Sequence, residues 1–112
     1  MASMLDRVQG SLDMMILKTL MNGTMHGWGI AHHIRLRSRE ALEVKQGALY
    51  PALHRLERQG WIAATWRASE NNRQAKYYRL TAGGRKQLEA DANEWHRLVA
   101  AVELVLAATG KS

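Results

Sequence analysis

The sequence predicts an α+β fold that is mostly α-helical, with one small β-hairpin before a long C-terminal helix. Three observations support this prediction. Apolar residues recur at helical spacing in the first half of the chain, two β-rich segments flank a polar link at residues 68–74, and a strict apolar repeat follows Thr81. A chain of 112 residues suits a single folding unit. We therefore expect residues 1–80 and the helix of residues 81–112 to form one compact unit.

The first helix is predicted to begin at Ser11. A serine oxygen at a helix start accepts a backbone N–H, and the negative charge of Asp13 suits the positive end of the helix dipole. Apolar residues then cover most of the circumference, so this helix should lie at the centre of the fold. Asn22 and Gly23 are typical of a helix end.

A second helix is predicted from Gly27, because Ile30 and Ile34 stand four residues apart on one face. This helix leads into a basic run at residues 35–39. Apolar and charged residues then alternate at residues 42–45, and this alternation predicts a short strand.

The third helix, residues 46–59, is the most informative. Three leucines between Leu49 and Leu56 share one face, which should face the core. The opposite face carries small, polar and basic residues, namely Gly47, Pro51, His54, Arg55 and Arg58, with Tyr50 on its flank. Because proline is tolerated only near the first turn, Pro51 places the helix start near Gln46 and leaves free N–H groups there.

Two extended segments follow at residues 61–66 and 75–80, both containing aromatic residues and bearing Ile, Thr or Tyr. The link between them is too polar to bury. Together they predict a β-hairpin whose basic, flexible tip region includes Arg73 and Lys76.

Thr81 is predicted to cap the last helix, which should run to about residue 108. Apolar residues then recur at alternating steps of four and three, at Leu88, Ala92, Trp95, Val99, Val102 and Leu106. This spacing is typical of a helix that pairs with another helix. A second apolar stripe lies beside the first, at Leu98, Ala101 and Val105. One stripe can pack on the parent domain, but two on a terminal helix favour a partner. We predict a homodimer held by Leu88, Trp95, Val99, Val102 and Leu106.

The positive charge is concentrated in the middle of the chain. The formal net charge is +6, and residues 41–80 carry seven Lys or Arg against three acids, whereas residues 81–112 carry four of each. Such an excess is expected where one part of a protein faces a polyanion. Charge alone is equally compatible with a solubilising surface.

Other classes of function find little support. Cysteine is absent, which removes disulfides and thiolate chemistry. His32 and His33 are adjacent on a helix and diverge by about 100°, and the remaining histidines lack metal-ligand spacing, so we expect no metal and no cofactor. No nucleophile elbow or phosphate-cradling loop occurs, so we expect no enzyme. No secretion signal or membrane-length apolar run is evident, and we expect a cytoplasmic protein.

The order helix, helix, short strand, helix, hairpin, long helix predicts a winged helix-turn-helix with a long C-terminal dimerisation helix. In such a fold the start of the third helix can reach base edges in the major groove of DNA. Free helix N–H groups, Arg73 and Lys76 can hold phosphates. The alternative is a winged-helix module that docks an acidic protein partner without binding DNA.

Four segments carry a resemblance to a known family: GSLDMMILKTL, MHGWGIAHHI, GALYPALHRLERQGWI and KYYRLTAGGRKQL. Over essentially the whole chain the sequence resembles the PadR family of bacterial transcriptional regulators, in its short form with a single C-terminal helix. The resemblance implies a homodimer that binds a roughly palindromic operator of double-stranded DNA, usually as a repressor. It implies DNA contact by Gln46, Gly47, Tyr50, Arg73 and Lys76. His54 and Arg55 join this set because they lie on the polar face of the third helix, opposite its leucines.

The resemblance also bears on sensing. In some short relatives an aromatic residue lines a pore between the subunits that takes flat aromatic compounds, and Trp95 falls at a matching place. Trp95 is therefore a candidate for binding a small aromatic effector, although it could equally fill volume at the dimer interface. Tyr50 has a similar alternative, since its ring could pack on the hairpin. Two departures from the family pattern are Trp28, where tyrosine is more common, and Asn71-Asn72 at the wing tip.

Overall fold

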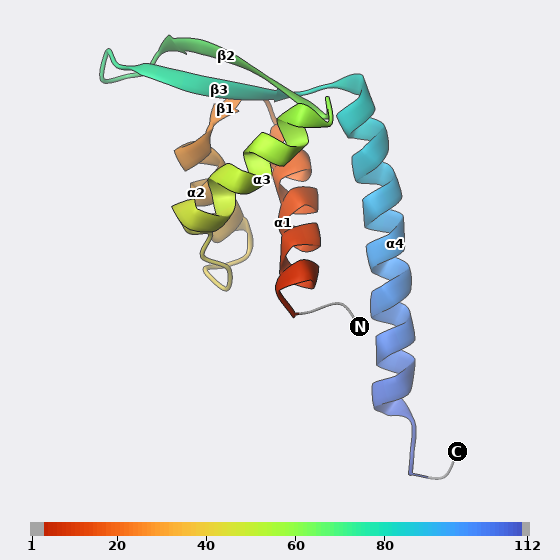
Figure 1. Cartoon of the computed structure of the whole chain (residues 1–112). Helices are drawn as coiled ribbons and strands as arrows, with labels where there is room; N and C mark the ends of the chain where they lie inside the picture. The colour runs from red at the N-terminus through yellow and green to blue at the C-terminus, as the bar shows by residue number, and fades with distance from the viewer. Residues whose placement is uncertain (1–3, 111–112) are drawn as a thin grey trace.

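A computed structural model describes the backbone of residues 4–110 and the side chains of residues 10–110. Residues 1–3 and 111–112, which belong to the predicted N-terminal part (1–80) and C-terminal helix (81–112), lie outside the described residues. The elements follow in the order α1 (Met4–Leu20), β1 (Met25–His26), α2 (Gly27–Arg37), α3 (Gln46–Arg58), β2 (Ile62–Ala68), β3 (Gln74–Leu80) and α4 (Ala82–Ala107) (Figure 1). The predicted α+β fold, mostly α, is confirmed.

The sheet is antiparallel and has the strand order β1-β3-β2. In the hairpin Ile62 pairs with Leu80 and Trp66 pairs with Lys76, while Met25 of β1 pairs with Tyr78 on the other edge of β3. The helices α1, α2 and α3 lie against one face of this sheet, and α4 leaves from the end of β3 (Figure 1). The helix-turn-helix is formed by α2 and α3, and the wing by β2 and β3.

The core is built around α1, as its apolar circumference predicts. Ile16 and Leu17 are fully buried, and α1 contacts α2, α3 and α4. The other helices and the sheet each contribute apolar side chains to this cluster, including Ile30, Ile34, Leu49, Leu53, Leu56, Ile62 and Tyr78. The inward face of α3 is thus the leucine face that the sequence predicts, and the opposite face is left to solvent.

Two local predictions are wrong. The first helix begins at Met4 and passes through Ser11, so Ser11 is not its N-cap. A serine favours a helix start by only about 1 kcal/mol, so it does not prevent a helix from passing through it. Residues 42–45 form no strand, because the free edge of β3 is taken by Met25 and His26 instead. Val44 packs against the core while Leu42 is exposed, which accounts for the alternation without a strand.

The start of α4 is fixed against β2 by a close backbone approach. The Thr81 side chain accepts a hydrogen bond from the Gly84 N–H at 3.0 Å and donates one to the Gly60 carbonyl at 2.7 Å, so the predicted cap is confirmed. A Cβ atom on Gly84 would overlap the Trp61 carbonyl oxygen. Glycine is therefore the residue that lets α4 approach the chain this closely.

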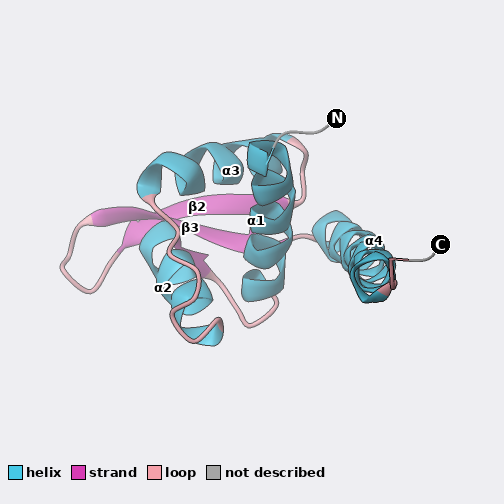
Figure 2. Cartoon of the chain, turned by 90° about the horizontal axis from the view of Figure 1, so that it is seen from below, coloured by secondary structure: helices cyan, strands magenta, loops and turns pink. Residues whose placement is uncertain are grey.

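The distal half of α4 projects from the rest of the fold. All side chains of residues 93–107 are exposed, and the molecule measures 63 × 28 × 25 Å. Its radius of gyration is 16.2 Å, whereas a compact domain of this size has one of about 13 Å. Figure 2 shows α4 nearly end-on, standing to one side of the other helices. Within residues 4–110, no helix is both long and apolar enough to cross a membrane.

Candidate nucleic-acid interface

The first turn of α3 is exposed to solvent. The N-cap residue Lys45 makes no side-chain hydrogen bond to the first turn, and Gln46 and Gly47 are exposed. Leu49 is buried one turn later, so the helix is anchored by its inner face while its first turn faces solvent. The positive end of the helix dipole is thereby available to an anion.

Tyr50 ties this end of α3 to α2. Gly27 is buried, and a Cβ atom placed on it would lie 3.1 Å from the Tyr50 hydroxyl oxygen and 3.1 Å from its Cε1. The tyrosine ring therefore packs over the start of α2, and close to half of its surface stays exposed. The predicted alternative for Tyr50 was packing on the hairpin, and its contact with Gly27 adds a packing role on α2.

The start of α2 is held by His26, for which the sequence predicted no structural role. The Nδ1 atom of His26 accepts a hydrogen bond from the Gly29 N–H at 3.0 Å, and the ring meets Tyr77 edge-on at 5.4 Å. His26 is thus the N-cap of α2. Its position directly before a predicted helix was the signal that could have identified this role. Trp28 follows and stacks on His32, with 5.0 Å between ring centroids and 8° between ring planes.

The wing ends in a tight turn. Ser69 donates its N–H to the Arg73 carbonyl at 2.7 Å, and Asn72 adopts a left-handed backbone with φ of 59°. The turn leaves the Arg73 side chain exposed at the tip. On the outer face the Arg67 guanidinium lies 4.0 Å from the centre of the Tyr77 ring.

Lys76 joins the wing to α3. Its Nζ atom lies 2.9 Å from a carboxylate oxygen of Glu57, and this hydrogen bond raises the pKa of Lys76 above its ordinary value. The ammonium group is therefore charged at neutral pH. Because it has three N–H donors, the bond to Glu57 leaves others for a further acceptor.

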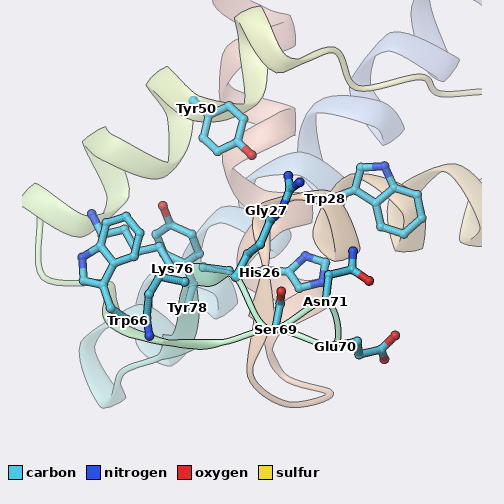
Figure 3. A pocket seen from close by; sticks show the side chains of 13 residues that line it. His26, Gly27, Trp28, Tyr50, Trp66, Ser69, Glu70, Asn71, Lys76 and Tyr78 are labelled. Atoms are coloured by element: carbon cyan, nitrogen blue, oxygen red, sulfur yellow. The ribbon is translucent and has the colours of Figure 1, made fainter.

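A groove of about 870 Å³ separates the wing from α2 and α3 (Figure 3). Trp66 and Lys76 come from the wing, Tyr50 from α3, and His26 and Trp28 from the start of α2. Arg73 lines the groove at the wing tip. A second, smaller hollow on the other side of Tyr50 and Trp28 is lined in part by Gln46, Lys45 and Arg35. The two hollows make one continuous face of mixed aromatic and basic character.

Comparison with known proteins identifies the family. The sequence model of the transcriptional regulator PadR-like family matches residues 16–90, which include α2, α3 and the wing. The chain belongs to the PadR-like family of transcriptional regulators. A solved transcriptional regulator from Clostridium thermocellum is 31% identical, with a TM-score of 0.80 over 88% of this chain and 95% of its own. A PadR family transcription regulator from Clostridium difficile is 28% identical, with a TM-score of 0.72 over 86% of this chain and 98% of its own. An uncharacterized protein from Lysinibacillus sphaericus is 28% identical over 101 residues, covering 90% of this chain and 93% of its own.

In this PadR-like chain, the DNA-contact residues predicted from the sequence fall into two groups. Gln46, Tyr50, Arg73 and Lys76 line the two hollows, and Gly47 is exposed beside them. His54 and Arg55 lie further along α3 and line neither hollow. His54 is exposed, whereas the Arg55 guanidinium is 2.8 Å from a carboxylate oxygen of Asp13 on α1. Arg55 is thus paired within the protomer, a contact that its place on the polar face of α3 did not predict.

The ion pair with Arg55 does not lower the pKa of Asp13 below its ordinary value. Burial, and to a lesser extent the negative charge of Asp91, raises the pKa of Asp13 above its ordinary value, although the hydrogen bond and charge of Arg55 lower it. The pair is only partly shielded from solvent, so we assign it a positioning role between α1 and α3.

The apolar stripe predicted on α4, from Leu88 to Leu106, is called the α4 seam below. In the structure its first residue is buried and its distal residues are exposed. Leu88 is buried in the protomer's own core, with 7% of its surface exposed, because the first turns of α4 pack on α1. Trp95, Val99, Val102 and Leu106 are exposed, Leu106 to 73%. Trp95 borders a groove of about 490 Å³ between α1 and α4, where the carboxylates of Asp13, Asp91 and Glu94 also lie.

The five histidines do not assemble into a site. Among the described residues, no group of three or more His, Asp or Glu is arranged to hold a metal ion.

Proposed function

We propose that this PadR-like regulator binds duplex DNA in a sequence-specific manner, as a homodimer, and represses transcription from its operator. The observation that carries the proposal is the continuous face formed by the exposed first turn of α3 and the basic wing. An α-helix fits the major groove, and residues near its N-terminus reach base edges. Gln46 is suited to read bases, while Arg73 and Lys76 on the wing are suited to hold phosphates.

The dimer is proposed from the exposed part of α4. Four large apolar side chains, Trp95, Val99, Val102 and Leu106, repeat at steps of four, three and four along a projecting helix. An apolar surface of this kind on a free helix favours burial against a second copy. A two-fold dimer presents two α3 helices to the DNA, so its operator should be palindromic.

A small aromatic effector is proposed to act near Trp95. The groove beside Trp95 opens between α1 and α4, next to the proposed dimer surface, and its three carboxylates favour a cationic compound. A planar cation could stack on the indole and change how α4 meets its partner. Titration with a planar cationic dye should quench Trp95 emission, and equal quenching of the wild type and Trp95→Ala would exclude this site.

The DNA proposal is tested by footprinting the DNA that flanks the protein's own gene, together with titrations of operator and random duplexes. Arg73→Ala should weaken both duplexes alike and reduce the salt dependence, log K against log salt, by about 0.9. Gln46→Ala should instead reduce the preference for operator by about 10- to 100-fold, because it removes a base contact. Arg85→Ala is the matched control, since it removes the same charge from the start of α4, away from the wing tip (Figure 1).

The result that would contradict the proposal is a footprint that is absent even at low salt. If an acidic protein partner then bound to the wild type, and Arg73→Ala abolished this binding, the winged-helix interaction module would be the correct function instead.

The dimer is tested by sedimentation at micromolar concentration. Val102→Asp places a charge within the exposed seam and should yield the mass of one chain, whereas the wild type should sediment with twice that mass. Arg97→Asp changes a well-exposed residue about half a helix turn from that seam and should remain dimeric. A wild type that sediments as one chain would refute the dimer.

A further inference from the structure

Two tryptophan side chains stand at the groove between the wing and the α2–α3 pair, and neither has a role in the core. Trp28 and Trp66 are each 66% exposed, and both line this groove (Figure 3). Tryptophan normally buries a large apolar surface when a protein folds. Leaving two indoles uncovered on the face proposed for DNA suggests that binding covers them.

The position of Trp66 follows from the register of the wing. Side chains alternate between the two faces of a strand, so Ile62, Ala64 and Trp66 lie together on the inner face of β2, which faces the helices. Ile62 is buried and Ala64 packs against the core, but the strand continues past the core before it reaches Trp66. The indole therefore lies on the overhanging inner face of the wing, beside its cross-strand neighbour Lys76.

Trp28 is held in place before any ligand arrives. Its ring stacks in parallel on His32, one turn later in α2, with a centroid distance of 5.0 Å. The helix start that carries it is capped by His26 and covered by Tyr50. A preformed side chain loses little conformational freedom on binding, and its contact is correspondingly more favourable.

The lining of the groove favours an anionic ligand with apolar surfaces. Arg73 and Lys76 lie along it, and Glu70 is the one carboxylate among the thirteen described residues that line it. If α3 enters the major groove and the wing lies over the adjacent minor groove, the sugar–phosphate strand that separates those grooves must pass between α3 and the wing. A sugar–phosphate strand offers both anionic phosphates and apolar deoxyribose faces.

We propose that this groove holds one sugar–phosphate strand of the bound duplex, with deoxyribose rings packed on Trp28 and Trp66 and phosphates held by Arg73 and Lys76. This proposal rests on the proposed DNA binding and adds two residues to it. It assigns to the tryptophans a contact that positions the protein on the duplex and reads no sequence.

Three properties distinguish such a contact from a base contact or an ionic contact. Trp66→Ala should weaken operator and random duplexes by the same factor, about tenfold. The salt dependence of binding should stay at the wild-type value, because the indole carries no charge, whereas Arg73→Ala lowers it. Trp66→Phe keeps a flat apolar ring and should restore most of the affinity. A change in the operator preference, or no loss of affinity in Trp66→Ala, would overturn the proposal.

The chain supplies its own controls for a direct test, because it has four tryptophans. Variants that retain one tryptophan, with phenylalanine at the other three positions, are quenched with acrylamide before and after adding a duplex whose anisotropy reports binding. Trp28 and Trp66 should each become several-fold less accessible. Trp61, at the base of the hairpin, and Trp95, on α4, line no part of the groove and should be unchanged.

Each outcome decides a different point. If the duplex binds while Trp28 or Trp66 stays as accessible as in the free protein, the packing proposed for that strand is wrong but DNA binding stands. If no duplex binds at low salt, the proposed function fails and the inference with it. If replacing Trp61 prevents folding, the double variant Trp28→Phe, Trp66→Phe gives the same contrast, since its remaining tryptophans should gain no protection.

Discussion

Substitution of Gly84 by alanine tests how α4 is attached to the winged domain. A Cβ atom at this position would overlap the Trp61 carbonyl oxygen and lie 2.8 Å from the Leu80 Cδ1 atom. Backbone atoms at the base of the hairpin cannot move aside as a flexible side chain would, so the helix itself must shift. Gly83→Ala is the matched control, since a Cβ there would find its nearest neighbours at 3.8 Å, an ordinary contact.

The expected magnitude follows from comparing the two variants. Both replace a glycine in the first turn of α4, so both gain the same helix preference, at most about 0.5–1 kcal/mol. Gly84→Ala also introduces overpacking, which costs about 1–3 kcal/mol or more. The difference between the variants in free energy of unfolding should therefore be about 1–3 kcal/mol or more and should report the overlap alone.

Urea unfolding followed by circular dichroism measures this difference, with both variants at the same protomer concentration because the stability of the proposed dimer would depend on that concentration. Gly83→Ala should match or slightly exceed the wild type, and Gly84→Ala should unfold at lower urea. Equal midpoints for the two variants would refute the close approach of α4 to Trp61.

Three further predictions concern the cap, the core and the ion pair. Thr81→Ala removes the hydrogen bond to the Gly84 N–H and should cost about 1 kcal/mol in urea unfolding, while Thr81→Ser should restore most of it. Leu53→Ala empties a site in the core that is 1% exposed and should cost about 2–5 kcal/mol, and a loss below 1 kcal/mol would contradict that burial. The raised pKa of Asp13 means that the folded protein binds its proton more tightly than the unfolded chain, so this group's contribution to stability is present at acid pH and is lost as the pH rises through the raised pKa. Asp13→Asn should abolish that part of the pH dependence and be no less stable than the wild type at pH 7, whereas identical pH profiles would show that burial does not raise the pKa.

Helix α3 and the wing were predictable because their signals are local. Pro51, which lies inside α3, limits how far the helix can extend before it, the leucine spacing fixes the inner face, and Gly60 ends the helix with a left-handed backbone at φ of 78°. The wing follows from two β-rich segments around a polar turn. These features depend on residues close in sequence, so a single chain is enough to read them.

The features that were not predicted depend on contacts between distant residues. Arg55 belongs to the polar face of α3 by spacing, but its pairing with Asp13 requires knowing that α1 passes beside it. Leu88 fits the α4 seam by spacing, yet it is buried because only the first turns of α4 reach the core. The cap formed by His26 is different, because its hydrogen bond reaches only three residues along the chain, to the Gly29 N–H, and its position before the helix was visible in the sequence.

The most direct measurement of the central claim compares the affinity of the purified wild type for the duplex upstream of its own gene with that for a shuffled duplex of the same composition, at about 0.15 M salt. A sequence-specific regulator should bind the first duplex at least about a thousandfold more tightly. A dimer should also give two-fold symmetric protection, with half-sites spaced by whole helical turns of about 10–10.5 base pairs. Equal affinity for the two duplexes would contradict sequence-specific regulation by this protein.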